Sequence, residues 1–197
     1  MKKWLFVFLF FLSIAAYAEE EEGKFPWNLT MFAGGAKLCD ENGCFGPNGL
    51  AVGLAFGRQF TPHWSFELDG TWVRSTINEV PRFDEATGIF FIPQLQRTRV
   101  WGGATFLRTM KHFGSRSDLF IAVGAVGAFE RQTEKVPPEI FPLPSKNLGV
   151  KGGVSGGAGL NLWFSRTWGI RPEARFYAVA TPLSGLRYTA GLIHQFQ

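Results

Sequence analysis

Acidic and basic side chains recur at alternate positions in three stretches of the chain. The pairs are Glu67 and Asp69, Arg97 and Arg99, and Glu173 and Arg175. Alternate residues of a β-strand project from the same face of a sheet, so both members of each pair are expected to point to one side. Carboxylates held beside arginines can act as general acids and bases, and they can also neutralise one another where water is excluded.

The positions of these stretches predict particular ion pairs. A hairpin centred near Phe83 would join the strand that carries the two acids to the strand that carries the first two arginines. In that register, Glu67 lies opposite Arg99. Asp69 lies opposite Arg97. We therefore predict two coupled acid–base pairs that stabilise the protein.

Other charged residues share the same strand face and extend the predicted network. They are Glu130, Lys151, Arg171, Glu173 and Arg175. One interpretation is a path for protons or a small ion leak. The glycines that would leave space for it are Gly149, Gly153, Gly157 and Gly159. We favour a salt-bridged plug, because a barrel of eight strands encloses only enough room for side chains.

Eight segments of alternating hydrophobicity must position these side chains. They cover residues 27–36, 50–60, 64–74, 94–108, 119–131, 148–164, 170–180 and 186–196. An even number of segments of about 10 residues, each with period-2 alternation, is typical of outer-membrane barrels. Closed pairing lets strands cross lipid because every backbone polar group is then hydrogen-bonded. The sequence therefore predicts an all-β fold, namely an eight-stranded antiparallel up-and-down transmembrane β-barrel.

The connections between the segments alternate in length. Long loops rich in Pro, Gly or charge cover residues 37–49, 75–93 and 132–147, whereas the turns at residues 61–63 and 165–169 are short. This asymmetry is typical of barrels with long extracellular loops and short periplasmic turns. Apolar residues among charges in the long loops predict contact with a surface partner. Alternatively, these loops extend the strands and fold over the barrel mouth. Basic residues that are candidates to meet lipopolysaccharide phosphates are Arg82, Arg131, Lys135 and Lys146.

A soluble barrel of the lipocalin kind, carrying a small ligand in the periplasm, is an alternative with the same number of strands. Three features favour the membrane barrel. Charges of both signs share the polar face, Gly and Ala crowd that face as a narrow lumen requires, and aromatic residues lie near the segment ends as in aromatic girdles. The girdle residues are Trp27, Trp64, Trp72, Phe164, Trp168, Tyr188 and Phe196.

Residues 1–18 have the pattern of a secretory signal peptide. Two lysines precede an apolar run of about 13 residues, and Ala16-Tyr17-Ala18 forms a small-x-small cleavage site. The run is too short for a membrane helix, which needs about 20 residues. We predict cleavage after Ala18, which leaves residues 19–197 as one outer-membrane barrel domain. The remaining charge forms no basic stripe, which argues against binding to nucleic acid.

Cys39 and Cys44 enclose a short loop of four residues. Because exported proteins meet an oxidising compartment, we predict a disulfide that shapes the tip of this loop. The spacing differs from that of a CxxC redox site, and Asp40 and Asn42 are too few ligands for a calcium loop. We expect no metal and no cofactor.

The sequence of residues 169–176 is Gly-Ile-Arg-Pro-Glu-Ala-Arg-Phe, and residues 186–196 alternate aromatic and apolar positions. In these features the mature chain resembles the small eight-stranded barrels of the group formed by the OmpA transmembrane domain, OmpX and the opacity proteins. The resemblance implies that the last segment, with Tyr188 and Phe196, is an assembly signal for the barrel-assembly machinery. It also implies partners among outer-membrane lipids and lipopolysaccharide. Gln197 departs from the group, whose signal normally ends in an aromatic residue.

Barrels of this size also include enzymes that modify lipid A, so catalysis must be considered. Such enzymes need a nucleophilic serine beside a histidine. His63 and His194 fall at the predicted periplasmic end and His112 follows the fourth segment, whereas Ser184 falls in an outer loop. We therefore predict a structural or surface-interaction role without catalysis, and a lipid A-modifying enzyme stays as the alternative.

Overall fold

The computed structural model describes residues 25–39, 48–85, 87–114, 116–136, 145–180 and 183–196. Within these ranges β-strands account for most residues. None of the described segments forms a helix long and apolar enough to span a membrane.

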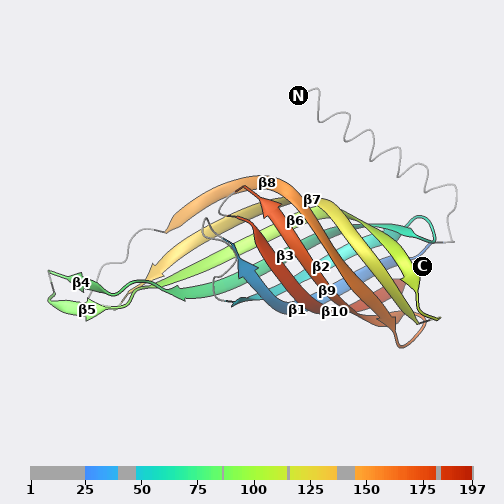
Figure 1. Ribbon diagram of the computed structural model, residues 1–197, viewed down its shortest axis with the longest axis horizontal. Helices are drawn as coiled ribbons and strands as arrows, with labels where there is room; N and C mark the ends of the chain where they lie inside the picture. The colour runs from blue at the N-terminus through green and yellow to red at the C-terminus, as the bar shows by residue number, and fades with distance from the viewer. Residues whose placement is uncertain are drawn as a thin grey trace, which may run out of the picture.

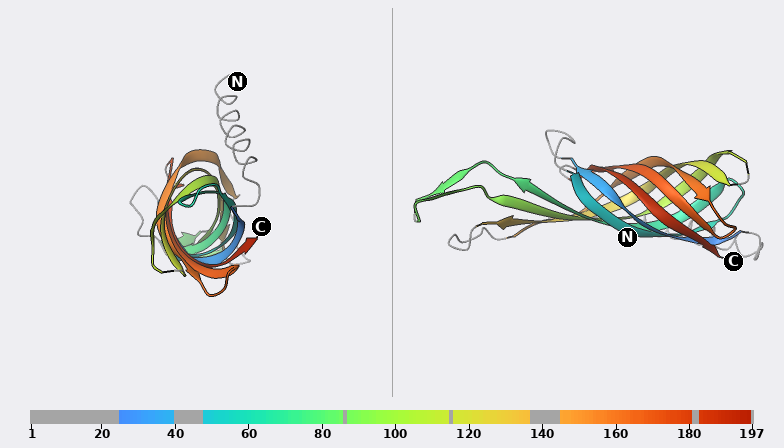
Figure 2. Two further views of the ribbon diagram at one scale, coloured as in Figure 1. Left: turned by 90° about the vertical axis from the view of Figure 1, so that its right-hand side faces the viewer. Right: turned by 90° about the horizontal axis from the view of Figure 1, so that it is seen from below.

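Eight strands close into an antiparallel barrel, as Figure 1 shows. In order around the wall they are β1 (Trp27–Leu38), β2 (Asn48–Gln59), β3 (Trp64–Asn78), β6 (Gln94–His112), β7 (Ser117–Lys135), β8 (Lys146–Trp163), β9 (Trp168–Val179) and β10 (Gly185–Phe196). The first and last strands pair along their whole length and close the ring that Figure 2 shows end-on. The predicted fold class is confirmed.

The alternation of each strand places apolar side chains outside the barrel and small or charged ones inside. In β2, for example, Leu50, Val52 and Leu54 are exposed, whereas Ala51 and Ala55 are buried. A narrow lumen accepts such small side chains, and the large apolar side chains of β2 lie on the outer wall. The inner and outer faces are therefore those that the sequence predicts for a membrane barrel, and the reverse of those of a lipocalin-like carrier.

Four neighbouring strands, β3, β6, β7 and β8, continue beyond the level at which the rest of the wall ends. Pairing of β2 with β3 stops at Arg74, and pairing of β9 with β8 stops at Gly153. At the far tip, β4 (Arg82–Asp84) and β5 (Ile89–Phe91) form a two-stranded hairpin that projects along the barrel axis in Figures 1 and 2. Residues 75–93 therefore extend the strands, as one interpretation predicts, but the hairpin projects along the barrel axis and does not fold over the barrel mouth (Figure 2). Contact with a surface partner stays a prediction.

The barrel has two unlike ends, which we name here. At the turn end, β2 leads into β3, β6 into β7, and β8 into β9. At the loop end, the extended strands carry the β4–β5 hairpin away from the barrel. Each end thus presents a different surface.

The register between β3 and β6 differs from the predicted one. Glu67 lies opposite Thr105 instead of Arg99. Asp69 does not lie opposite Arg97 either, because Arg97 pairs with a residue of β3 that is nearer the loop end. Both predicted cross-strand pairs, Glu67–Arg99 and Asp69–Arg97, are therefore wrong.

The position of the hairpin turn explains this difference. The N–H of Gly88 donates to the carbonyl oxygen of Asp84 at 2.8 Å, and Gly88 has a φ of 68°. The Asp84 carboxylate also accepts a hydrogen bond from the Thr87 hydroxyl at 2.5 Å. Glycine adopts this left-handed conformation without a steric penalty. The chain therefore reverses after Asp84 and not at Phe83, which shifts every residue pair between β3 and β6.

Candidate functional site

Charged side chains fill the interior of the barrel. Among the residues that the structure describes, nine charged side chains are buried, each at most 9% exposed. The four carboxylates are Glu67, Asp69, Glu130 and Glu173, and the five arginines are Arg97, Arg99, Arg171, Arg175 and Arg187. Isolated charges in such an environment cost several kcal/mol each, so their arrangement in pairs decides whether the interior is stable.

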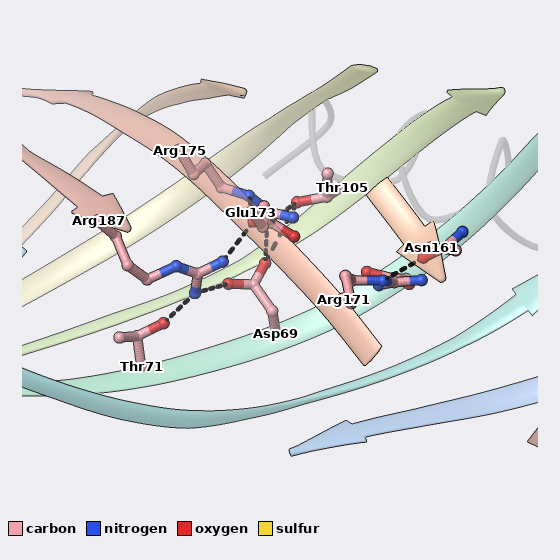
Figure 3. Close-up of polar contacts among 9 residues, drawn as sticks. Asp69, Thr71, Thr105, Asn161, Arg171, Glu173, Arg175 and Arg187 are labelled. Atoms are coloured by element: carbon pink, nitrogen blue, oxygen red, sulfur yellow. Dashed lines mark hydrogen bonds and ion pairs between the residues drawn. The ribbon is translucent and has the colours of Figure 1, made fainter. Parts of the chain in front are cut away.

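The central cluster joins opposite walls of the barrel, as Figure 3 shows. Arg175 of β9 places Nη1 2.9 Å from Asp69 Oδ1 of β3, and this nitrogen also donates to Thr105 Oγ1 at 3.0 Å. Arg187 of β10 places Nη2 2.6 Å from Glu173 Oε1, and Arg175 Nε lies 2.7 Å from the same oxygen. Two carboxylates thus neutralise two guanidinium groups across the full width of the lumen.

A second pair lies nearer the turn end. Arg171 Nη1 is 2.5 Å from Glu67 Oε1, and Arg171 Nε donates to Asn161 Oδ1 at 2.8 Å. The guanidinium group also lies over the ring of Phe120, 5.1 Å from its centroid. A polar cavity of about 260 Å³ opens from Arg171 toward the turn end. Arg171, together with Asn161, therefore lines this cavity.

A third cluster closes the loop end. The carboxylate of Glu130 accepts hydrogen bonds from Arg97 Nε at 2.7 Å and from Arg99 Nε at 2.6 Å. Gln132 Nε2 donates to the same carboxylate at 2.8 Å, and Arg99 Nη1 donates to the carbonyl oxygen of Ser184 at 2.5 Å. One carboxylate here serves two arginines, so the cluster keeps one positive charge in excess.

An aromatic layer separates the third cluster from the central one. The rings of Trp101 and Tyr177 stack with their centroids 4.4 Å apart and an angle of 10° between their planes. Arg99 lies over the ring of Trp101 on one side, and Arg187 lies over the ring of Tyr177 on the other. Trp101 Nε1 donates to the carbonyl oxygen of Leu183 at 3.3 Å. The layer and its flanking arginines form a continuous packed block.

The void beside the central cluster is very small. Its volume is about 10 Å³, and its lining includes Thr30, Phe32, Arg175 and Arg187. A cavity needs about 10–15 Å³ to hold one water molecule. The centre of the lumen is therefore filled with side chains and has no room for a small ligand.

Most residues of the predicted network lie in this interior, but their partners differ from the predicted ones. The predicted residues that contact an opposite charge there are Glu67, Asp69, Arg97, Arg99, Glu130, Arg171, Glu173 and Arg175. Lys151 is exposed, because β9 ends opposite Gly153 and no wall faces the next residues of β8. Including Lys151 in the network is therefore wrong.

Arg187, which is fully buried at the centre, does not belong to the predicted network. Its position carries a signal that could have revealed it. In residues 186–196, Leu186 and Tyr188 point outward, so Arg187 between them must point inward. A lone arginine at an inward position of a narrow barrel indicates a partner on a neighbouring strand.

The serine and histidines considered for catalysis lie at opposite ends of the barrel. Ser184 is at the loop end, where its hydroxyl donates to a backbone carbonyl at 2.6 Å. At the turn end, His112 Nδ1 lies 2.6 Å from Asp118 Oδ1, and the ring of His63 is 6.0 Å from that of His112. His194 packs on the outer wall. None of these histidines therefore lies close enough to Ser184 to act as its general base.

Two predictions fall partly or wholly outside the described residues. Cys39 is buried, and its N–H donates to the carbonyl oxygen of Ser184 at 3.0 Å, but Cys44 lies outside the described residues. Residues 1–18 lie outside them as well. The disulfide and the signal peptide therefore stay predictions. Tyr188 and Phe196 are exposed on the outer wall, and their recognition by the barrel-assembly machinery stays a prediction as well. Within the described ranges, no group of three or more His, Cys, Asp or Glu side chains could hold a metal ion.

The projecting hairpin carries exposed apolar side chains. Val80 is 78% exposed and Phe90 is 77% exposed. Phe83 and Phe90 face each other across β4 and β5 with ring centroids 4.6 Å apart. At its base, Arg82 bonds to Glu79 at 2.5 Å and to Glu134 at 2.9 Å. The hairpin is thus held in place by ion pairs and presents an apolar tip.

A closed eight-stranded barrel with an apolar outer wall and a charged interior defines the fold class of small outer-membrane barrels. Comparison with solved structures agrees with this assignment. Ail of Yersinia pestis, solved with the heparin analogue sucrose octasulfate, is similar with a TM-score of 0.58 and 13% identity over 87% of this chain and 98% of that one. Neisserial surface protein A is similar with a TM-score of 0.57 and 13% identity over 86% and 97% of the two chains.

The N-terminal β-barrel domain of Pseudomonas aeruginosa OprF is a third similar structure. Its TM-score is 0.51, with 11% identity over 87% of this chain and 97% of the other. No family model matches the sequence, and no curated protein matches it. At these identities the likeness concerns the fold.

Proposed function

We propose that the protein is an outer-membrane β-barrel with a structural and surface-contact role and without catalysis. The observation that carries this proposal is the distribution of charge. All nine buried charged side chains lie inside the barrel, while the outer wall of β2 and its neighbours is apolar. Such a wall is stable in lipid and would aggregate in water.

The packed interior supports a structural role. Ion pairs join opposite walls, and an aromatic layer closes the lumen toward the loop end. A barrel filled in this way resists flattening and has no passage for large solutes. The position of Ser184 away from the histidines supports a role without acyl transfer.

The projecting hairpin supports the surface-contact role. It lies beyond the barrel at the loop end, which corresponds to the long extracellular loops of outer-membrane barrels. Its exposed apolar side chains, Val80 at the base and Phe90 in β5, are suited to burial against a partner. Arg82 is engaged by two carboxylates, so Arg131, Lys135 and Lys146 remain the candidates to contact lipopolysaccharide phosphates.

Export and assembly complete the proposal. Residues 1–18 would direct secretion and be removed after Ala18. The barrel-assembly machinery would then recognise the last strand through Tyr188 and Phe196. A disulfide between Cys39 and Cys44 would shape the loop that follows β1.

The proposal is tested by the position of each barrel end in whole cells. An epitope inserted between Thr87 and Gly88 should be labelled by antibody on intact cells. The matched control is the same epitope inserted between Ser165 and Arg166 at the turn end, which should be labelled only after permeabilisation. If neither epitope is labelled on intact cells, or if the protein is found in the soluble periplasmic fraction, the proposal is wrong.

A further inference from the structure

The charged side chains on the outer wall are all of one sign. Within the described part of the chain, every Asp and Glu of the barrel strands points inward or lies beyond the wall, whereas several Lys and Arg point outward. Near the turn end the outward basic residues are Arg58, Arg108 and Lys111. Near the loop end they are Lys37, Arg74 and Arg131, with Lys135 farther along β7. We call the first three the turn-end ring.

An uncharged band separates the two sets. On β3 it extends from Trp64, which pairs with Arg108, to Arg74. For a strand rise of about 3.3 Å and a tilt of about 40°, this stretch spans about 25 Å along the barrel axis. That is the height of the apolar band of an outer-membrane barrel, about 25 Å. The two basic sets therefore lie at the two interfaces of a bilayer.

Aromatic side chains hold the turn-end ring at this level. The guanidinium of Arg58 lies over the ring of Trp27, 5.1 Å from its centroid, and that of Arg108 lies 5.4 Å over the ring of Trp64. Lys111 Nζ lies 5.1 Å over the ring of Phe113. Interfacial aromatic residues sit at the level of the lipid headgroups. Each basic group is thus placed where a headgroup phosphate would lie.

The surroundings favour an anionic ligand. Asp118 is the one described carboxylate in the strands near the rim of the turn end. It is engaged by His112 Nδ1 at 2.6 Å and by Trp163 Nε1 at 3.0 Å, and it points inward. A basic surface at a membrane interface attracts anionic lipids by about 1 kcal/mol per Lys or Arg.

We propose that the turn-end ring binds the phosphodiester headgroups of anionic phospholipids in the leaflet on that side. This inference rests on the proposed function, because it requires the barrel to span a bilayer. Arg58 and Arg108 supply planar groups that can bind two phosphate oxygens at once, and Lys111 supplies a point charge. The aromatic rings keep the three side chains from folding away into solvent. The ring thereby fixes the depth of the barrel in the membrane.

The test measures lipid selectivity. The purified protein is reconstituted into phosphatidylcholine vesicles, and electron paramagnetic resonance measures the motionally restricted fraction of spin-labelled phosphatidylglycerol and of spin-labelled phosphatidylcholine. We expect phosphatidylglycerol to be preferred about twofold or more at low salt, and less at about 1 M salt, where the Debye length is about 3 Å.

Double variants distinguish lipid binding by the turn-end ring from attraction by positive charge elsewhere at the same end. Arg58→Gln/Arg108→Gln should lower the preference by at least half, whereas Arg58→Lys/Arg108→Lys should retain most of it. The matched control, Arg116→Gln/Arg166→Gln, removes the same charge from the turns at the same end and should change the preference little. An equal loss in the two Gln variants, or no preference in the wild type, would overturn the proposal. The absence of any restricted lipid would instead contradict the membrane barrel itself.

Discussion

Arg187 Nη2 and Glu173 Oε1 lie 2.6 Å apart at the centre of the barrel, and both side chains are almost completely shielded from solvent. Arg187 also lies over the ring of Phe32, 4.2 Å from its centroid. A buried charge that loses its partner cannot be hydrated, so the two residues depend on each other.

The dependence of Arg187 on Glu173 is testable by a double-mutant cycle. Glu173→Gln alone should lower the free energy of unfolding by about 3–5 kcal/mol, because the two buried arginines Arg175 and Arg187 would then have Asp69 as their common carboxylate partner. Arg187→Gln alone should have a similar effect, and the double variant should lose less than the sum. Urea unfolding in lipid vesicles measures all four proteins.

The control for this cycle is the exposed pair at the base of the hairpin. Arg82→Gln and Glu134→Gln should each cost no more than about 1 kcal/mol, with little coupling, because Arg82 is in contact with water. Additive effects at Arg187 and Glu173, within about 0.5 kcal/mol, would contradict the proposed dependence.

The cluster at the loop end predicts a large effect of a single neutral substitution. Glu130→Gln removes the one carboxylate that Arg97 and Arg99 share, so two like charges would then face each other inside the barrel. We expect a loss of about 3–5 kcal/mol in the free energy of unfolding. Glu130→Asp, which keeps the charge, should retain part of that stability. Equal stability of the wild type and Glu130→Gln would show that the cluster is hydrated.

The packed interior also predicts which glycines accept a side chain. A Cβ at Gly53 would overlap the carbonyl oxygen of Gly70 and the ring of Phe32, whereas a Cβ at Gly70 would meet nothing within 4 Å. Gly53→Ala should therefore destabilise the barrel by about 1–3 kcal/mol. Gly70→Ala should change its stability by less than about 0.5 kcal/mol. Urea unfolding measures both variants. A larger loss of stability for Gly70→Ala than for Gly53→Ala would contradict a tightly packed interior.

The hairpin is expected to contribute to contact and not to barrel stability. Replacing residues 80–92 by two glycines should leave the free energy of unfolding within about 0.5 kcal/mol of the wild type, since the barrel pairs of β3 and β6 remain. Adhesion of cells that display the protein should fall. A control with Val80→Ser/Phe90→Ser keeps the backbone and should lose adhesion to a similar extent. Unchanged adhesion in both variants would exclude the hairpin as the contact element.

Strand positions could be predicted from the sequence because alternation along a strand is local. Leu50, Val52 and Leu54 show their outward face without any knowledge of neighbouring strands. Inward positions of charge follow from the same pattern, which is why Glu173 and Arg175 were predicted inside. The strands and their number therefore follow from the period. The choice of a membrane barrel over a lipocalin-like one also depends on the charges, small residues and aromatic residues of the segments.

Register and pairing could not be predicted in the same way. The turn after Asp84 and the bulge between Phe129 and Arg131 shift the partners of whole strands, and neither changes the alternation on either side. Asp69 contacts Arg175 from the opposite wall, a relationship that depends on barrel closure. Lys151 has the correct alternation but lies beyond the end of β9. Such errors reflect three-dimensional context that a strand pattern does not contain.

The central claim is that the chain forms a closed membrane barrel with a salt-bridged interior. Electrophoresis of the purified protein in SDS, with and without boiling, tests this claim most directly when combined with membrane fractionation. We predict that the unboiled protein migrates differently from the boiled protein and is recovered in the outer-membrane fraction, because the closed hydrogen-bonded wall resists detergent. Identical migration of the two samples, together with recovery in the soluble periplasmic fraction, would contradict the claim.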